Sequence, residues 1–185
     1  MAGYITYWPK EQIKKLQKEK DNGPIKVIFG SVHTKMPSIK KVKAGDTVYP
    51  VTIDNGTLCV VAKLPVEQIE DAYEYLVREL GNQCGALTLE GVDPMEYYNS
   101  PMKSHMCHQQ PFNCCSETAA IGTNGTSIKL RPIPKEKLPE LLFGPSKSKQ
   151  RPILLNDKGS PKVISISSNV RKMSDETQKI FDSLF

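Results

Sequence analysis

Most of the cysteine and histidine in the chain lies in one stretch. Two of the three histidines and four of the five cysteines fall there: Cys84, His105, Cys107, His108, Cys114 and Cys115. Imidazole and thiolate are ligands that zinc prefers, so this set could hold a structural zinc ion. Zinc ligands usually come as Cys-x2-Cys or His-x3-His pairs, however, and Cys114 and Cys115 are adjacent. Zinc is therefore one interpretation of this stretch and not the favoured one.

Two other interpretations need no metal. A catalytic thiol requires a neighbouring base, and Cys115 could take His105 or His108 in that role, with Glu117 nearby in sequence. Alternatively, the thiols pack as small apolar side chains at the start of a hairpin. The sequence favours this last interpretation, because nothing local brings a base to a thiol. An odd number of cysteines with an adjacent pair also indicates reduced thiols, as in the cytoplasm.

A basic, proline-containing stretch over 31–43 follows an apolar run that ends at Gly30. It leads into Gly45-Asp46, a turn signal in which Gly permits a positive φ and Asp caps the turn, and then into a β-branched run from Thr47. This order of strand, basic loop, Lys-x-Gly-Asp turn and strand resembles the opening of the PUA-like superfamily, which includes the PUA, ASCH and EVE domains. The resemblance covers about residues 25–63.

The resemblance implies a ligand site on the basic loop, because PUA-like proteins bind RNA or modified nucleobases through the loop after an early strand. The residues that it assigns to the ligand are Ser31, His33, Thr34, Lys35, Lys40 and Lys41. Lys35 would contact phosphate, and His33 would bond a base or shuttle a proton. Some ASCH proteins are similar to small ribonucleases, and cleavage here would use His33, Lys35 and Tyr49 as proton donors and acceptors. The alternative is a solvated lysine loop with no ligand.

Length and composition are typical of one globular domain over 1–185. Apolar residues make up 38% of the chain and charged residues 24%. The excess of 25 Lys and Arg over 20 Asp and Glu gives a net charge of +5, which permits a polyanionic partner without requiring one. No apolar run approaches the roughly 20 residues that span a bilayer, and the first residues do not resemble a signal peptide. We therefore expect a cytoplasmic protein without membrane contact.

Turn signals and periodicity predict a mixed chain of hairpins and helices. The expected helices are an N-terminal one over 9–20, one over 65–80, a short one over 134–143 and a C-terminal one over 174–185 capped by Ser174. The expected strands are 25–29 and three hairpins: 47–53 with 57–62, 117–121 with 126–130, and 152–155 with 162–166. These elements predict an α+β fold, a small, partly closed β-barrel with flanking helices, because closure removes exposed strand edges.

Three functions are consistent with these features. The favoured one is a module that binds nucleic acid, a nucleotide or a modified base, with RNA as the first choice. The alternatives are a metal-independent ribonuclease or phosphodiesterase of ASCH type, and a non-catalytic interaction protein with a structural zinc site. No phosphate-binding glycine loop, dinucleotide fingerprint or serine hydrolase elbow is present in the sequence.

Overall fold

The computed structural model describes residues 1–18, 20–30, 39–80, 118–167 and 170–185. The strands are β1 (Gly3–Tyr7), β2 (Val27–Gly30), β3 (Thr47–Asp54), β4 (Thr57–Val60), β5 (Leu64–Pro65), β6 (Gln68–Asp71), β7 (Thr118–Ile121), β8 (Arg131–Pro132), β9 (Leu142–Phe143), β10 (Arg151–Pro152) and β11 (Arg171–Lys172). The α-helices are α1 (Lys10–Lys18), α2 (Ala72–Leu80) and α5 (Asp175–Asp182), and the 3-10 helices are η2 (Lys135–Glu140), η3 (Lys147–Lys149) and η4 (Val163–Ser165). The described chain is thus α+β with mostly sheet, as the sequence predicts.

A six-stranded sheet forms the centre of the molecule. Its order is β11-β1-β3-β4-β8, and β5 pairs with β3 beside this path. β1 lies parallel to β3, from Gly3 opposite Thr47 to Tyr7 opposite Val51, and the other pairs are antiparallel. The sequence predicts no strand before the first helix, and β1 corrects that expectation. Its partner begins some forty residues further on, and no local turn signal reveals such a pairing.

A second sheet, of order β2-β7-β6, is joined to the first at two places. On one side the chain passes from β5 to β6, where Val66 N donates to Asp46 O (2.8 Å) and Glu67 N donates to Ile121 O (2.8 Å). On the other side Thr126 N donates to Lys63 O (2.9 Å) and its carbonyl accepts from Ile25 N (3.0 Å). The described strands do not close into a barrel.

The hairpin of β3 and β4 is confirmed. Asp54 pairs with Thr57, and the two turn residues Asn55 and Gly56 have φ angles of 47° and 78°. Both values lie in the left-handed region that a two-residue hairpin turn of this kind requires. This element is predictable because all of its determinants are local.

The second predicted hairpin, around Asn124-Gly125, is wrong. β7 pairs with β2 and β6, and residues 126–130 form no strand. Gly125 has a different role, because a Cβ built on it would lie 1.7 Å from the carbonyl oxygen of Ile25. The glycine therefore permits a close approach between two backbones that join the sheets, and the Asn-Gly pair makes no hairpin turn.

Two predicted helices are also corrected. Residues 68–71 form β6, so the helix expected over 65–80 begins only at Ala72, where Asp71 accepts from Glu74 N (3.0 Å). Pairing of β6 with β7 overrides the helical period there. The helix expected over 134–143 is η2, with Pro139 inside it, followed by β9.

The third predicted hairpin is partly present. A bridge pairs Leu155 with Pro161, and Lys162 N donates to Leu154 O (2.7 Å), so the chain does reverse over 156–159. The expected second strand is absent, because Val163–Ser165 turn into η4. Among the described strands, none pairs with Val163–Ser165, and without such a partner this β-branched run does not form a strand.

Side chains alternate across β3 and divide the interior into two clusters, one on each face of the central sheet. Cluster 1 lies on the Val48 side, which we name face 1: Tyr4, Trp8, Ile13, Leu16, Ile25, Ile28, Ile39, Val42, Val48, Val61, Ala62, Leu64, Val66 and Ala120. Cluster 2 lies on the Tyr49 side, face 2: Ile5, Tyr49, Val51, Leu58, Val60, Ile133, Leu138, Leu141, Phe143, Ile153, Ile166, Met173 and Phe181.

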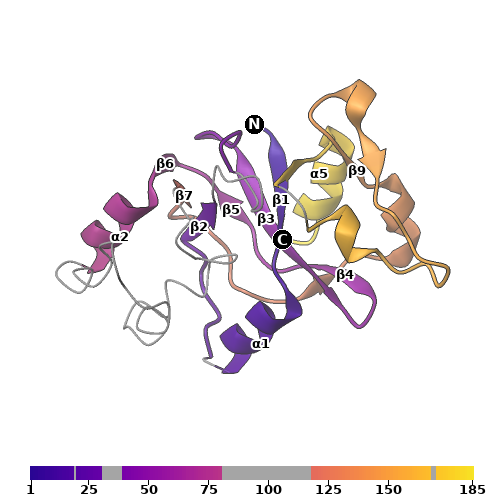
Figure 1. Ribbon diagram of the computed structural model, residues 1–185, viewed down its shortest axis with the longest axis horizontal. Helices are drawn as coiled ribbons and strands as arrows, with labels where there is room; N and C mark the ends of the chain where they lie inside the picture. Colours follow the sequence, from indigo (N-terminus) through magenta and orange to yellow (C-terminus); the bar gives the residue numbers. More distant parts are fainter. Residues whose placement is uncertain (19, 31–38, 81–117, 168–169) are drawn as a thin grey trace.

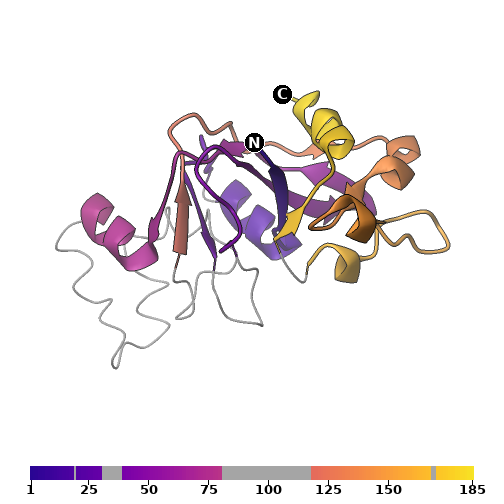
Figure 2. The ribbon, with the colours of Figure 1, turned by 90° about the horizontal axis from the view of Figure 1, so that it is seen from above.

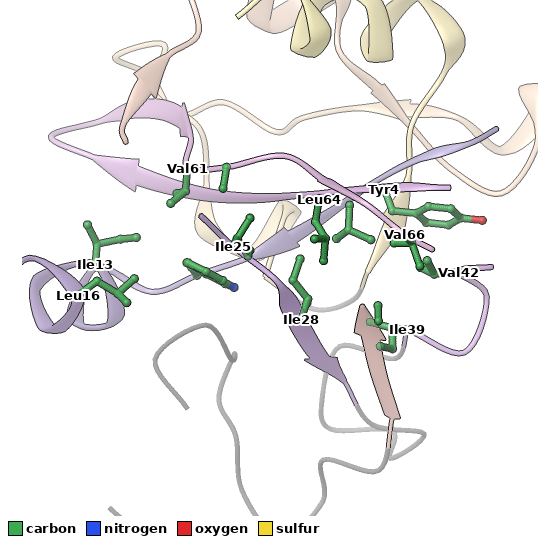
Figure 3. Close-up of a cluster of buried hydrophobic side chains, with 14 residues drawn as sticks. Tyr4, Ile13, Leu16, Ile25, Ile28, Ile39, Val42, Val61, Leu64 and Val66 are labelled. Atoms are coloured by element: carbon green, nitrogen blue, oxygen red, sulfur yellow. The ribbon is translucent and has the colours of Figure 1, made fainter. Parts of the chain in front are cut away.

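The flanking elements occupy different faces. Figure 3 shows Ile28 of β2 in the middle of cluster 1, with Ile13 and Leu16 of α1 at one end and Tyr4 and Val42 at the other. Face 2 is covered by α5, which begins where the Ser174 side chain accepts from Thr177 N (3.1 Å). α2 lies at one end of the molecule, whereas α5 lies in the other half, between the central sheet and the segments around β9 (Figure 1 and Figure 2).

Candidate ligand-binding surface

Two consecutive turns over residues 39–46, here named the lysine turn, display the basic residues that the sequence assigns to a ligand. Ile39 and Val42 are buried in cluster 1, and Val42 N donates to Ile39 O (2.9 Å). Lys40 and Lys41 lie between these two anchors with exposed side chains. Alternating buried and exposed residues thus fix the backbone and leave the lysines facing solvent.

Asp46 holds the second half of the lysine turn. Its carboxylate accepts from Ala2 N (2.8 Å) and from Lys43 N (3.0 Å), and Gly45 has a φ of 90°. The Gly-Asp turn that marks the family resemblance therefore has a structural role, since it ties the start of β1 to the start of β3. Lys43 is exposed beside it.

A buried tyrosine connects the lysine turn to the edge of the central sheet. The Tyr4 hydroxyl donates to Lys41 O (3.2 Å), and burial, with a smaller contribution from Asp46, raises the Tyr4 pKa. In β11, Lys172 pairs directly with Tyr4, so both side chains leave the sheet on face 1. The structure thus adds Lys172 to the group that the sequence identifies, and we name the set Lys40, Lys41, Lys43 and Lys172 the lysine surface.

Two lysines of the turn, Lys41 and Lys43, keep their charges exposed. Among the described residues, no carboxylate forms an ion pair with Lys41 or Lys43. The nearest acidic group in the turn, Asp46, already accepts two backbone hydrogen bonds. Ammonium groups held on a fixed turn can bind phosphate oxygens as point charges.

The other predicted ligand residues lie outside the described residues: Ser31, His33, Thr34 and Lys35. So do the metal candidates Cys84, His105, Cys107, His108, Cys114 and Cys115. Described residues show where these two segments join the fold. Segment 31–38 follows Gly30, segment 81–117 precedes Thr118, and Gly30 pairs with Thr118 in the second sheet. The two segments therefore meet the described chain at the same end of that sheet.

Tyr49, the third residue predicted for proton transfer, lies away from the lysine turn. Its buried ring packs on face 2, and its hydroxyl donates to Asp182 of α5 (2.7 Å), which also forms an ion pair with Lys63. Burial and this hydrogen bond to a carboxylate raise the Tyr49 pKa well above its ordinary value. A tyrosine in this setting keeps its proton and holds α5 on the sheet, and a part in proton transfer stays a prediction.

Within the part of the chain that the structure describes, no three His, Cys, Asp or Glu side chains come together to hold a metal ion. Cys59, the described cysteine, is buried on β4, and burial raises the pKa of its thiol. It packs as a small apolar side chain, with its Sγ 3.8 Å from Thr57 O. None of the described helices has the length and apolar character needed to cross a membrane.

A cavity of about 260 Å³ lies at the start of α5, which sequence reasoning did not identify. It is lined by Ser146, Lys147 and Gln150 on one side and by Lys172, Asp175 and Glu176 on the other. Lysine and carboxylate residues both line the cavity, so its lining shows no single sign of charge.

Comparison of the chain with models of protein families, with curated proteins and with solved structures gives no match.

Proposed function

We propose that this protein is a module that binds nucleic acid or a nucleotide, with RNA as its ligand, and that the lysine surface contacts the phosphates. The observation that carries the proposal is the lysine turn: three lysines within four residues stand on a backbone anchored by Ile39, Val42 and Asp46. Clustered basic side chains on a held backbone create a positive potential that attracts a polyanion, and phosphate contacts supply a large share of the affinity in such complexes.

The finer proposal is a PUA-like arrangement. It is supported by the order of strand, basic loop, Gly-Asp turn and strand, and by the two links between the sheets at Val66-Glu67 and at Thr126. In that arrangement Ser31, His33, Thr34 and Lys35 would add base and phosphate contacts to the lysine surface.

The test is the binding of labelled single-stranded RNA and DNA, followed by anisotropy at about 50 and about 200 mM salt. The variant is Lys40→Gln, Lys41→Gln and Lys43→Gln together. Its matched control is Lys147→Gln, Lys149→Gln and Lys158→Gln, which removes the same charge from exposed side chains elsewhere. Both sets leave the core unchanged.

We expect wild-type protein to bind RNA in preference to DNA, with an affinity that falls as salt rises. Each lost phosphate contact reduces the slope of log K against log salt by about 0.7, so the turn variant should lose about 2 and the control almost nothing. Equal slopes for the two variants would assign the binding to net charge alone. No binding by wild-type protein at the lower salt would make the lysine turn an ordinary solvated loop.

A further inference from the structure

Three aliphatic side chains stay exposed on one part of the molecule, residues 153–166, here named the arm. Leu154 is 56% exposed, Val163 44% and Ile164 73%. Elsewhere in the described residues, the exposed large apolar side chains are Met1 and Phe185, at the two ends of the chain. The arm thus holds all of the described internal residues that leave a large apolar side chain in water.

The arm is well held in spite of this exposure. Its two ends are rooted in cluster 2 by Ile153 and Ile166, which are 4% and 0% exposed. At its tip the Asn156 side chain accepts from Lys158 N (3.0 Å) and Ser160 N (2.9 Å). Because Lys162 N also donates to Leu154 O, Leu154 lies beside the residues that lead into η4. The backbone thus brings Leu154 close to Val163 and Ile164 on a fixed support.

The rim of this apolar surface is basic. Arg151 precedes the arm, Lys158 and Lys162 lie on it, and all three are exposed; within residues 151–166 the acidic residue is Asp157. A contiguous apolar area with a charged rim is typical of a protein interaction site. The rim also defines the partner, since a positive rim disfavours a second basic copy of the same arm and favours an acidic surface.

We propose that the arm binds an acidic amphipathic segment of another protein, whose apolar side chains cover Leu154, Val163 and Ile164 while its carboxylates meet the basic rim. A nucleic acid suits this surface less well. Single strands gain affinity by stacking bases on aromatic rings, and residues 153–166 contain no aromatic residue. The proposal is independent of the lysine surface, which carries no exposed aliphatic residues.

The probe is a fluorescein-labelled helical peptide of about 18 residues, with Leu at every third and fourth position and Glu on the opposite face. A second peptide carries Lys in place of Glu. Full-length protein is titrated against both, and its oligomeric state is measured by sedimentation. The variant is Leu154→Ser with Ile164→Ser, whose exposed positions leave the fold intact. Phe185→Ser is the matched control, because Phe185 is 43% exposed outside the arm.

We expect the acidic peptide to bind at least tenfold more tightly than the basic one. The double serine variant should lose at least tenfold in affinity for it, and the control less than twofold. Equal binding of both peptides, or none up to millimolar concentration, overturns the proposal. It is also overturned if wild-type protein forms dimers that the serine variant lacks, since the occupant is then a second copy. Loss of RNA binding in the serine variant would likewise assign the arm to nucleic acid.

Discussion

The two faces of the central sheet are closed in different ways. Face 1 is covered by the second sheet and α1. Within the described part of the chain it leaves two buried polar atoms without a hydrogen-bond partner, Trp8 Nε1 and Thr52 Oγ1. Face 2 is covered by α5 and short segments, and the polar groups under α5 are paired, as Tyr49 with Asp182 and Ser174 with Thr177. A face with all groups paired serves stability, whereas orphaned polar atoms call for an explanation.

The two residues that carry these atoms are neighbours in the strand register. Tyr7 pairs with Val51 and Trp8 N donates to Val51 O (2.8 Å), so Trp8 and Thr52 occupy adjacent positions on parallel strands. Thr52 also pairs with Cys59, which places a third polar side chain of weak hydrogen-bonding power on the same face. Face 2 is thus held by paired polar groups, whereas face 1 buries two polar atoms without partners and carries the lysine surface at its rim.

The largest expected effect on stability comes from truncating Phe181, the aromatic side chain at the centre of cluster 2 on face 2. Phe181 is fully buried in α5, with its ring 5.5 Å from that of Tyr49 and 6.4 Å from that of Phe143, both edge to face. Phe181→Ala should lower the free energy of unfolding by about 3–5 kcal/mol. Urea unfolding measures this loss, with Ile164→Ala, whose side chain is 73% exposed, as the control. A loss below about 1 kcal/mol would show that face 2 does not depend on α5.

A smaller effect is expected from the bond that fastens α5. Tyr49→Phe removes the hydroxyl that donates to Asp182, and a hydrogen bond to a charged group contributes about 1.5–3 kcal/mol. Urea midpoints at neutral pH measure the change, and Tyr4→Phe is a control at the lysine turn, where the acceptor is a neutral carbonyl. If Tyr4→Phe lowers the free energy of unfolding more than Tyr49→Phe does, the hydrogen bond under α5 is not the stronger of the two, and this prediction is contradicted.

The same tyrosine predicts a pH dependence. Its pKa is raised in the folded protein, so the unfolded chain loses its proton near pH 10 while the native state keeps it. The contribution of Tyr49 to the free energy of unfolding is therefore fully present below about pH 10 and is lost as the pH rises above that value. Tyr49→Phe should lose less stability than wild type between about pH 9 and pH 11. Part of the fall remains, because burial also raises the pKa of Tyr4 and Tyr7.

The smallest effect is expected on face 1. Thr52→Val keeps the shape of the side chain and removes a buried hydroxyl without a partner, so it should be neutral or stabilise the fold by up to about 1 kcal/mol. Val51→Ala, on the opposite face, is the contrast and should destabilise. If Thr52→Val destabilises by 1 kcal/mol or more, the hydroxyl has a partner in solution, and face 1 holds a bound water beside Trp8.

Some of the fold was predictable from short stretches of sequence. The β3–β4 hairpin depends on Asn55-Gly56, the start of α5 on Ser174, and α1 on the spacing of Ile13 and Leu16. Each of these signals acts over a few residues, so the rest of the chain has little influence on it. The exposure of Lys40 and Lys41 on a turn is likewise determined by a few neighbouring residues.

Other parts depended on partners distant in sequence. Asn124-Gly125 has the same hairpin signal as Asn55-Gly56, yet β7 pairs with β2 and β6, and Gly125 meets Ile25 instead of a facing strand. The intrinsic preference of a residue for a strand or a turn is small and depends on its context, so the pairing of β7 with distant strands outweighs the local turn signal. The role of Lys172 was equally hidden, because only the β1–β11 register places it beside Tyr4.

By itself, the sequence determined the α+β class, the flanking helices, one hairpin and the basic turn, because these depend on composition and on contacts between near neighbours. Tertiary structure alone decided that the first residues form a central strand, that Tyr49 faces α5 and not the lysine turn, and that Leu154, Val163 and Ile164 share one exposed surface. The physical reason is that strands obtain their hydrogen bonds and their buried face from segments far along the chain.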